Sequence, residues 1–181
     1  MAAVRRGPPV SRPGPGGVLI TGVYGAGKSS VAAEIAHLLE RRRCPYALLD
    51  LDYLAWGGAD FDHDADYFGL MLRNLTAVAA NYREVGVDRF VVAWFVRDKG
   101  ALRAVRQAVG VPLRVVRLTV PWGDIRRRLA ADVSTGRHED LREAAAQIAA
   151  SEGVGVEDLV VANDRPIEVV AGEIMSWLAW P

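Results

Sequence analysis

The sequence predicts an α/β fold, a three-layer sandwich in which helices cover both faces of a parallel five-stranded sheet. Short apolar runs rich in β-branched residues alternate with longer runs of helical periodicity, which is typical of βαβ units. A glycine-rich segment, GVYGAGKSS at residues 22–30, separates the first apolar run from the first helical run. With 181 residues and 51% apolar content, the chain can bury a full core as a single domain.

The domain is expected to span residues 17–181, because residues 1–16 combine proline and glycine with two arginines and no apolar core, which predicts a flexible leader. Within the domain, the short β-branched runs predict strands at 18–21, 46–50, 89–95, 113–120 and 158–162. The longer amphipathic runs between them predict helices at 29–42, 65–85, 99–109, 121–133, 141–150 and 167–178. The fourth of these helices, for example, repeats Ile125, Leu129 and Val133 at helical spacing.

The segment GVYGAGKSS matches the pattern GxxxxGK[ST] of a phosphate-binding loop. In this pattern the glycines let backbone N–H groups surround a phosphate, Lys28 reaches the β/γ oxygens, and the Ser29 hydroxyl binds Mg²⁺. The helix that begins near Lys28 directs its positive dipole end at the same phosphates. The residues expected to contact a nucleoside triphosphate here are Gly22, Tyr24, Gly25, Ala26, Gly27, Lys28, Ser29 and Ser30.

Two carboxylates follow the second predicted strand in the run LLDLDYL. Asp50 and Asp52 lie two residues apart, so an extended backbone directs both toward the same side. Ligands of parallel sheets bind at this end of the strands. Phosphoryl transfer to an alcohol needs a metal anchor and an acceptor for the hydroxyl proton, and we assign Asp50 to Mg²⁺, through water, and Asp52 to the acceptor hydroxyl. Alternatively, one of them only caps the following turn.

Composition restricts the class of partner. Lys and Arg number 22 and Asp and Glu number 22, so no net charge attracts nucleic acid or anionic lipid, and a small-molecule substrate is expected. No segment approaches the roughly 18 apolar residues of a membrane span. Cys44, the only cysteine, has no internal disulfide partner. These features predict a cytoplasmic protein, and none of them indicates an oligomeric state.

The loop GVYGAGKSS, the strand end LDLD and the arginine-rich helix after the fourth strand together resemble the small P-loop kinases, such as shikimate kinase, gluconate kinase, adenylylsulfate kinase and chloramphenicol phosphotransferase. The resemblance covers about residues 17–180. It implies ATP as phosphate donor and the strand order 2-3-1-4-5. In shikimate-type kinases an equivalent DxD supplies a magnesium-side and an acceptor-side Asp, which correspond here to Asp50 and Asp52.

The same resemblance implies a lid around residues 122–140. Its arginines neutralise charge on the transferring phosphoryl group, and Arg128 and Arg137 are the candidates, with Lys28, for that catalytic role. The alternative is a solvated basic helix face. Related kinases often carry a second Arg four positions after the first, whereas this chain has Asp132 there.

Two further groups of candidates follow strand ends. In the resembled kinases the loop after the last strand surrounds adenine, so Asn163 and Asp164 either line that pocket or form the turn and helix cap before Pro166. Acceptor binding is expected between the second strand and the next helix. The acceptor-side candidates are Asp52, Tyr53, Trp56, Arg73 and Arg97.

Two classes of function fit these patterns. The first is an Mg-dependent ATP kinase acting on a small-molecule hydroxyl, such as a metabolite, nucleoside or antibiotic-like acceptor. The second is a nucleotide-binding regulatory or switch module with slow NTP hydrolysis. The pair Asp50 and Asp52 favours the kinase, because a switch has no use for an acceptor-side base.

Overall fold

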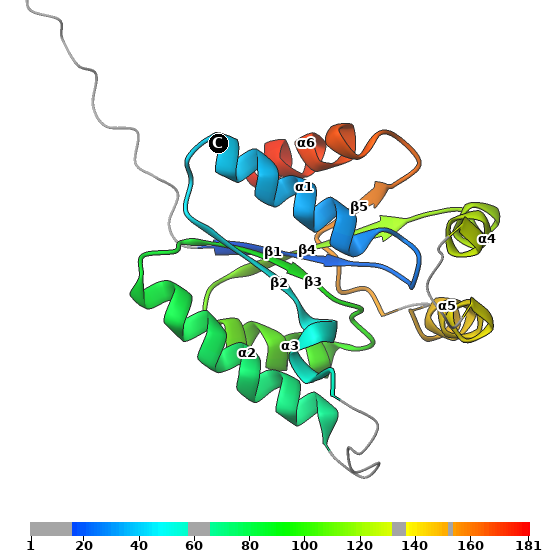
Figure 1. Cartoon of the computed structure of the whole chain (residues 1–181), viewed down its shortest axis with the longest axis horizontal. Helices are drawn as coiled ribbons and strands as arrows, with labels where there is room; N and C mark the ends of the chain where they lie inside the picture. The colour runs from blue at the N-terminus through cyan, green and yellow to red at the C-terminus, as the bar shows by residue number, and fades with distance from the viewer. Residues whose placement is uncertain (1–15, 58–65, 132–136, 152–153) are drawn as a thin grey trace, which may run out of the picture.

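A five-stranded parallel sheet forms the centre of the protein (Figure 1). The computed structural model describes residues 16–57, 66–131, 137–151 and 154–181. The strands are β1 (Gly16–Thr21), β2 (Tyr46–Asp50), β3 (Arg89–Ala93), β4 (Leu113–Thr119) and β5 (Leu159–Ala162). They pair in the order β2-β3-β1-β4-β5, so the predicted fold class and strand order are confirmed.

Helices cover both faces of the sheet. In Figure 1, α1 and α6 lie on one face and α2 and α3 on the other, whereas α4 and α5 lie together beyond the edge where the strands end. The helices are α1 (Lys28–Arg41), α2 (Tyr67–Glu84), α3 (Lys99–Val109), α4 (Trp122–Ala131), α5 (Arg137–Ser151) and α6 (Ile167–Leu178). A short 3₁₀ helix, η1 (Leu51–Ala55), follows β2 directly.

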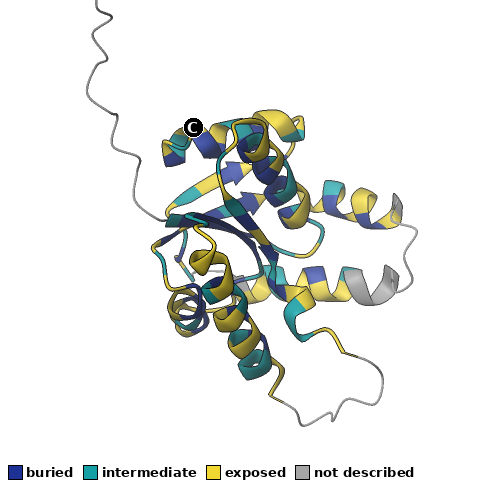
Figure 2. Cartoon of the chain, turned by 60° about the vertical axis from the view of Figure 1, so that its left-hand side comes forward, coloured by how far each residue is buried: buried dark blue, intermediate teal, exposed yellow. Residues whose placement is uncertain are grey.

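The core consists of one apolar layer on each face of the sheet (Figure 2). Because successive residues of a strand point to opposite faces, Val18 and Ile20 of β1 pack toward α1 and α6, and Leu19 packs toward α2 and α3. All three side chains are fully buried. A strand buried on both faces must be apolar throughout, which explains the uninterrupted apolar run before the glycine-rich loop.

A smaller third cluster joins α4 to α5. It contains Ile125 and Leu129 of α4 and Ala144 of α5, with Val23 of the glycine-rich loop packed against it. The predicted helix stripe at Ile125 and Leu129 is therefore the face that α4 buries. Val133, the third residue of that stripe, lies outside the described residues.

Several element boundaries differ from those predicted. β1 begins at Gly16, which pairs with Arg89, so the sheet includes one residue that was assigned to the leader. β3 ends at Ala93 and not at residue 95. Beyond Ala93, the Trp94 N–H still donates to the Ile20 carbonyl (3.1 Å), and the Val96 N–H donates to the Thr21 hydroxyl (2.9 Å), a side-chain acceptor.

The segment before residue 141 was also predicted incorrectly. The predicted helix begins at residue 141, whereas α5 begins four residues earlier, at Arg137. The sequence HEDLREAAAQIAA after Arg137 contains no glycine or proline, and acidic residues in a first helical turn interact favourably with the helix dipole.

Candidate active site

The glycine-rich loop connects β1 to α1 and curls around the N-terminus of that helix. Gly25 and Gly27 have φ values of 78° and 87°, a conformation that L side chains rarely adopt. A Cβ at Gly22 would lie 2.9 Å from the Leu118 carbonyl oxygen of β4, so only glycine fits at that point. The loop therefore has the glycine requirements of a phosphate-binding loop, as its sequence predicted.

Lys28 is the first residue of α1 and is buried, with 9% of its surface exposed. Its Nζ donates a hydrogen bond to the Val23 carbonyl of the loop (3.3 Å). Burial lowers the pKa of Lys28, and the nearby carboxylates of Asp52 and Asp50 oppose this change. A poorly solvated ammonium group within the loop attracts an anion more strongly than an exposed one does.

Ser29 and Asp50 join the loop to the end of β2. The Ser29 hydroxyl donates to Asp50 Oδ2 at 2.6 Å, and Asp50 Oδ1 accepts from the Asp52 N–H at 3.2 Å. The second contact makes Asp50 the N-cap of η1. Asp50 thus caps the turn but does not only cap it, because its other oxygen accepts the hydrogen bond from Ser29.

This pair of oxygens fits Mg²⁺. Mg²⁺ prefers oxygen ligands and is usually held by one or two protein groups together with waters and substrate phosphates. Ser29 and Asp50 supply a hydroxyl and a carboxylate beside the phosphate-binding loop. Among the described residues, no cluster of three or more His, Cys, Asp or Glu side chains offers an alternative, all-protein metal site.

Asp52 lies on η1 and lines an open pocket of about 410 Å³ beside the loop. Partial desolvation raises the pKa of Asp52, the Asp50 and Glu143 carboxylates raise it further, and the Lys28 ammonium acts in the opposite direction. The carboxyl therefore holds a proton more readily than an ordinary aspartate. The pocket is lined by Tyr24, Gly25, Gly27, Lys28, Ser29, Ser30, Asp52, Tyr53, Arg128 and Leu129.

Arg128 extends from α4 toward the loop and is partly exposed to solvent. Its guanidinium donates to the carbonyl oxygens of Asn163 (2.5 Å) and Ala26 (3.5 Å). Arg128 therefore lines the pocket and also stays exposed to solvent, so its catalytic role remains a prediction.

Asn163 follows β5 and is buried beside the loop, with 6% of its surface exposed. Its Nδ2 donates to the Ala26 carbonyl (2.8 Å). Asp164 is exposed and lies 3.9 Å from Arg165. The predicted capping role before α6 is wrong for both residues, because Pro166 occupies the N-cap without any side-chain hydrogen bond.

The acceptor-side candidates separate into two groups. Tyr53 lines the pocket. The Trp56 ring stacks on the Tyr53 ring, with the two ring centroids 5.2 Å apart. The two rings are 66% and 73% exposed, which leaves them open to a ligand. Arg97 instead covers the Phe68 ring (4.9 Å), and Arg73 is exposed on α2; neither lines the pocket.

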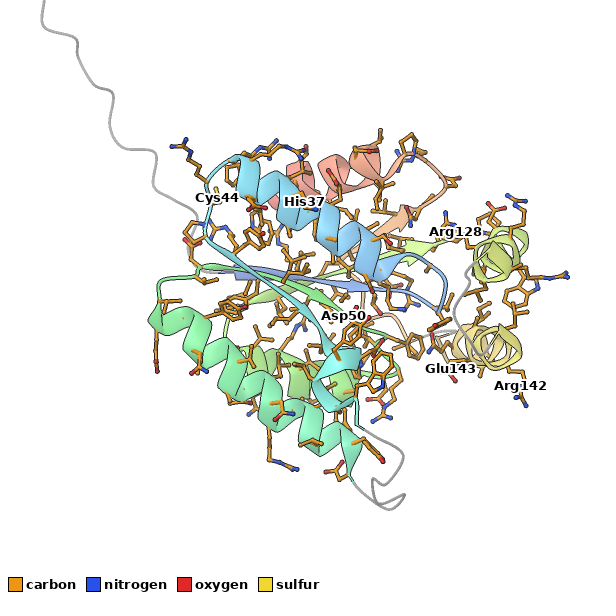
Figure 3. All side chains as sticks on the ribbon, in the orientation of Figure 1. His37, Cys44, Asp50, Arg128, Arg142 and Glu143 are labelled. Carbon is orange, nitrogen blue, oxygen red and sulfur yellow. The ribbon has the colours of Figure 1, made fainter. Side chains whose placement is uncertain are left out.

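Sequence reasoning missed a contribution from α5. Gln147 Oε1 accepts a hydrogen bond from the Tyr24 N–H of the loop (2.7 Å), and Gln147 Nε2 donates to Glu143 (2.7 Å). In Figure 3, Glu143 extends from α5 toward the sheet, whereas Arg142 extends away from it. The spacing of Glu143 and Gln147, one helical turn apart, was the only available signal. The structure does not describe Asp132 or the side chain of Arg137.

Comparisons with known proteins agree with this geometry. No protein-family model matches the chain, and no curated protein matches it in sequence. Solved structures do match. The Mycobacterium tuberculosis APS kinase CysC, in complex with AMPPNP and APS, is 22% identical with a TM-score of 0.61, over 93% of this chain and 99% of that one.

Two further structures match over similar lengths. A sugar kinase from Janibacter is 18% identical with a TM-score of 0.66, over 92% of this chain and 95% of that one. The shikimate kinase of Bacteroides thetaiotaomicron is 15% identical with a TM-score of 0.62, over 90% and 98%. The chain therefore has the fold of the small P-loop kinases. No helix among the described residues is long and apolar enough to cross a membrane.

Proposed function

We propose that the protein is an ATP-dependent kinase that transfers the γ-phosphate to a hydroxyl group of a small molecule in the presence of Mg²⁺. The observation that carries this proposal is that the phosphate-binding loop and one carboxylate, Asp52, line the same pocket, while a second carboxylate, Asp50, contacts the loop. Lys28, Ser29 and Asp52 line that pocket, and Asp50 hydrogen-bonds to Ser29. A protein that only binds or slowly hydrolyses a nucleotide has no need for the second carboxylate.

On the donor side, the backbone N–H groups of the loop and the Lys28 ammonium bind the nucleotide phosphates. Arg128, held in the pocket wall by two carbonyl oxygens, adds positive charge beside them. Ser29 and Asp50 would hold Mg²⁺, Asp50 through water, and a bound ion would supply positive charge beside the nucleotide phosphates. Asn163 holds the loop through its hydrogen bond to the Ala26 carbonyl, and the adenine contact of Asn163 and Asp164 stays a prediction.

On the acceptor side, Asp52 receives the proton of the attacking hydroxyl. Its raised pKa suits this role, because a base is more effective when its pKa is nearer the operating pH. Tyr53 and Trp56 present exposed ring faces next to Asp52 and bind the body of the acceptor. Arg73 and Arg97 lie outside the pocket lining, so their contribution stays a prediction.

ADP release tests this proposal. ATP and Mg²⁺ are supplied with a panel of polyols, nucleosides, sugar acids and hydroxylated antibiotics, and the Asp52→Asn variant serves as the comparison. We expect turnover that depends on one acceptor class and falls by roughly 10²–10⁴-fold in the variant. ATP binding without any acceptor-stimulated turnover, equal in both proteins, would contradict the kinase and favour the regulatory module.

A further inference from the structure

The two sides of the pocket beside the phosphate-binding loop differ in charge. Its described lining contains two cations, Lys28 and Arg128. Both donate hydrogen bonds to backbone carbonyls of the loop, those of Val23 and Ala26 respectively. These cations therefore belong to the donor side, where the nucleotide phosphates are proposed to bind. On the acceptor side, the charged side chain of the described lining is the Asp52 carboxylate.

A second carboxylate reaches the acceptor side from α5. The Tyr24 N–H, in the pocket wall, donates to Gln147 Oε1 at 2.7 Å. Gln147 Nε2 in turn donates to Glu143 Oε1 at 2.7 Å, so two successive hydrogen bonds connect Glu143 to the pocket wall. Glu143 extends from α5 toward the sheet (Figure 3). It is close enough to Asp52 for the two charges to interact. Carboxylates from two different elements, η1 and α5, thus act on the acceptor side.

Two aromatic rings accompany these carboxylates. Tyr53 lines the pocket next to Asp52, and the Trp56 ring stacks on the Tyr53 ring with an interplanar angle of 13°. Both residues are largely exposed. The face of an aromatic ring attracts a cation and repels an anion, because the quadrupole of the ring is negative at its face. Exposed rings beside carboxylates are therefore suited to a ligand with positive charge.

The arginines that were candidates for an anionic acceptor lie elsewhere. The Arg97 guanidinium covers the Phe68 ring, 4.9 Å from its centroid, and lies 3.7 Å from the Asp98 carboxylate. Arg73 is exposed on α2. Neither arginine lines the pocket as the structure describes it. An acceptor with a carboxylate or phosphate group would therefore meet two carboxylates without a compensating cation from the described lining of the acceptor side.

We propose that the acceptor carries an ammonium group, and that the Asp52 and Glu143 carboxylates select it together with the aromatic ring pair. The ligand class is a cationic hydroxyl compound, such as an amino sugar, an aminocyclitol or an amino alcohol. Its ammonium group pairs with Glu143 and contacts the ring faces, which leaves Asp52 for the hydroxyl. The cation also lies beside the negative γ-phosphate, so the charges are complementary across the pocket. This inference rests on the proposed function for the location of the acceptor, but it concerns binding and not phosphate transfer.

Binding of charge-matched ligands tests the inference. Calorimetry in the presence of Mg²⁺ and the non-hydrolysable ATP analogue AMPPNP measures the Kd of glucosamine, glucose and glucuronate. A second set is serinol, glycerol and glycerate. In each set we expect the ammonium compound to bind roughly three- to thirtyfold more tightly than the neutral one, and the carboxylate compound to bind most weakly. The inference is overturned if no ammonium compound of either set binds more tightly than its neutral counterpart.

Glu143→Gln tests the source of the selectivity. The substitution removes the charge but keeps an oxygen that accepts from Gln147 Nε2, so the contact of α5 with the loop is retained. It should weaken binding of the ammonium compound roughly two- to fivefold and leave the neutral compound unchanged. Equal losses for both compounds, or no loss for the ammonium compound, would overturn the assignment. The matched control is Glu168→Gln, because Glu168 is exposed on α6, on the face of the sheet away from α2 and α3 (Figure 1).

ADP release with the same ligands and ATP separates failure of this inference from failure of the proposed function. Ammonium-selective binding without phosphate transfer to any ligand would contradict the kinase and leave the charge selectivity in place. Transfer to neutral or acidic hydroxyl compounds, with no preference for an ammonium group, would overturn the charge selectivity and leave the kinase in place.

Discussion

The Ser29 hydroxyl donates a hydrogen bond of 2.6 Å to Asp50 Oδ2 and so joins the phosphate-binding loop to the carboxyl end of β2. The other oxygen of the same carboxylate caps η1, on which Asp52 lies. One side chain thus contacts both Ser29, the proposed metal-side residue, and the backbone of Asp52, the proposed base. Changes at Asp50 are expected to affect the two halves together.

The Asp50→Asn substitution should strongly weaken the response of turnover to Mg²⁺ and should lower the free energy of unfolding only slightly. Asparagine retains one oxygen acceptor and is a good N-cap residue, but it lacks the charge that supports the ion. We expect the Mg²⁺ concentration for half-maximal turnover to rise about 10–100-fold, with a loss of unfolding free energy of about 1 kcal/mol or less. A magnesium titration at fixed ATP measures the first effect and chemical denaturation the second.

The control for this experiment is Asp124→Asn. Asp124 lies on α4 and pairs with the exposed Arg127, away from the loop contacts. It should leave the magnesium response unchanged. An identical magnesium midpoint in the Asp50→Asn variant and the natural protein would remove Asp50 from the metal site.

Asp52→Asn is expected to lower turnover by roughly 10²–10⁴-fold and yet raise thermal stability near neutral pH. The folded protein raises the pKa of Asp52, so it binds this proton more tightly than the unfolded chain does. The charged form is therefore unfavourable in the folded state above the ordinary carboxyl pKa of about 4, and the cost disappears below it. Asparagine resembles the protonated form and avoids this cost.

Thermal unfolding of both proteins between pH 3.5 and 8 checks the sign. The Asp52→Asn variant should have the higher Tm at pH 7.5, and the difference should shrink as the pH falls through the raised pKa of Asp52 toward 4. Glu157 shows the opposite shift: burial acts to raise its pKa, but hydrogen bonds from the backbone and from Arg117 outweigh burial and lower it. A lower Tm for Asp52→Asn at pH 7.5 would show that the Asp52 charge stabilises the folded protein.

Gly27→Ala should damage the loop in a way that Asn163→Ala partly relieves. A Cβ at Gly27 would lie 2.6 Å from Asn163 Nδ2, and the φ of 87° is unfavourable for alanine. Asn163→Ala alone removes the hydrogen bond to the Ala26 carbonyl, at a cost of about 1–3 kcal/mol. In the double variant the steric conflict is absent, and about 1–2 kcal/mol of backbone strain remains.

A double-mutant cycle in the free energy of unfolding measures this coupling. We expect the double variant to be more stable than the sum of the two single effects predicts, by about 0.5–3 kcal/mol. Gly123→Ala is a suitable control, because a Cβ at Gly123 meets no atom within 4 Å. Strict additivity would mean that Gly27 and Asn163 are not in contact.

The sequence allowed the sheet and the phosphate-binding loop to be predicted because their signals are local. Strand-length apolar runs and the spacing of Lys28 and Ser29 depend only on neighbouring residues. The order of the strands came from resemblance to a family and not from the residues themselves. The double role of Asp50 was posed as alternatives, since a pattern cannot show that two oxygens of one carboxylate bind different groups.

The contacts of α4 and α5 with the loop were not predictable in the same way. Gln147 and Tyr24 are 123 residues apart, and nothing in either local sequence pairs them. Arg128 was identified as one of several arginines on a helix, but its contact with Asn163 depends on how α4 packs against Gly25. Such contacts follow from tertiary packing, which a single sequence does not specify.

Trp56→Ala should weaken acceptor binding without affecting ATP binding. Trp56 is 73% exposed and stacks on Tyr53 at the pocket edge, so its removal changes a ring face that is open to a ligand. Aromatic contacts of this kind contribute about 0.5–1.5 kcal/mol, which corresponds to a rise in acceptor KM of roughly two- to twelvefold. The Kd for ATP and the Tm should stay nearly constant, because exposed substitutions change stability by only about 0.5 kcal/mol. Tyr82→Ala, which removes another exposed ring on α2, should leave the acceptor KM unchanged, and an equal acceptor KM in Trp56→Ala would place the acceptor elsewhere in the pocket.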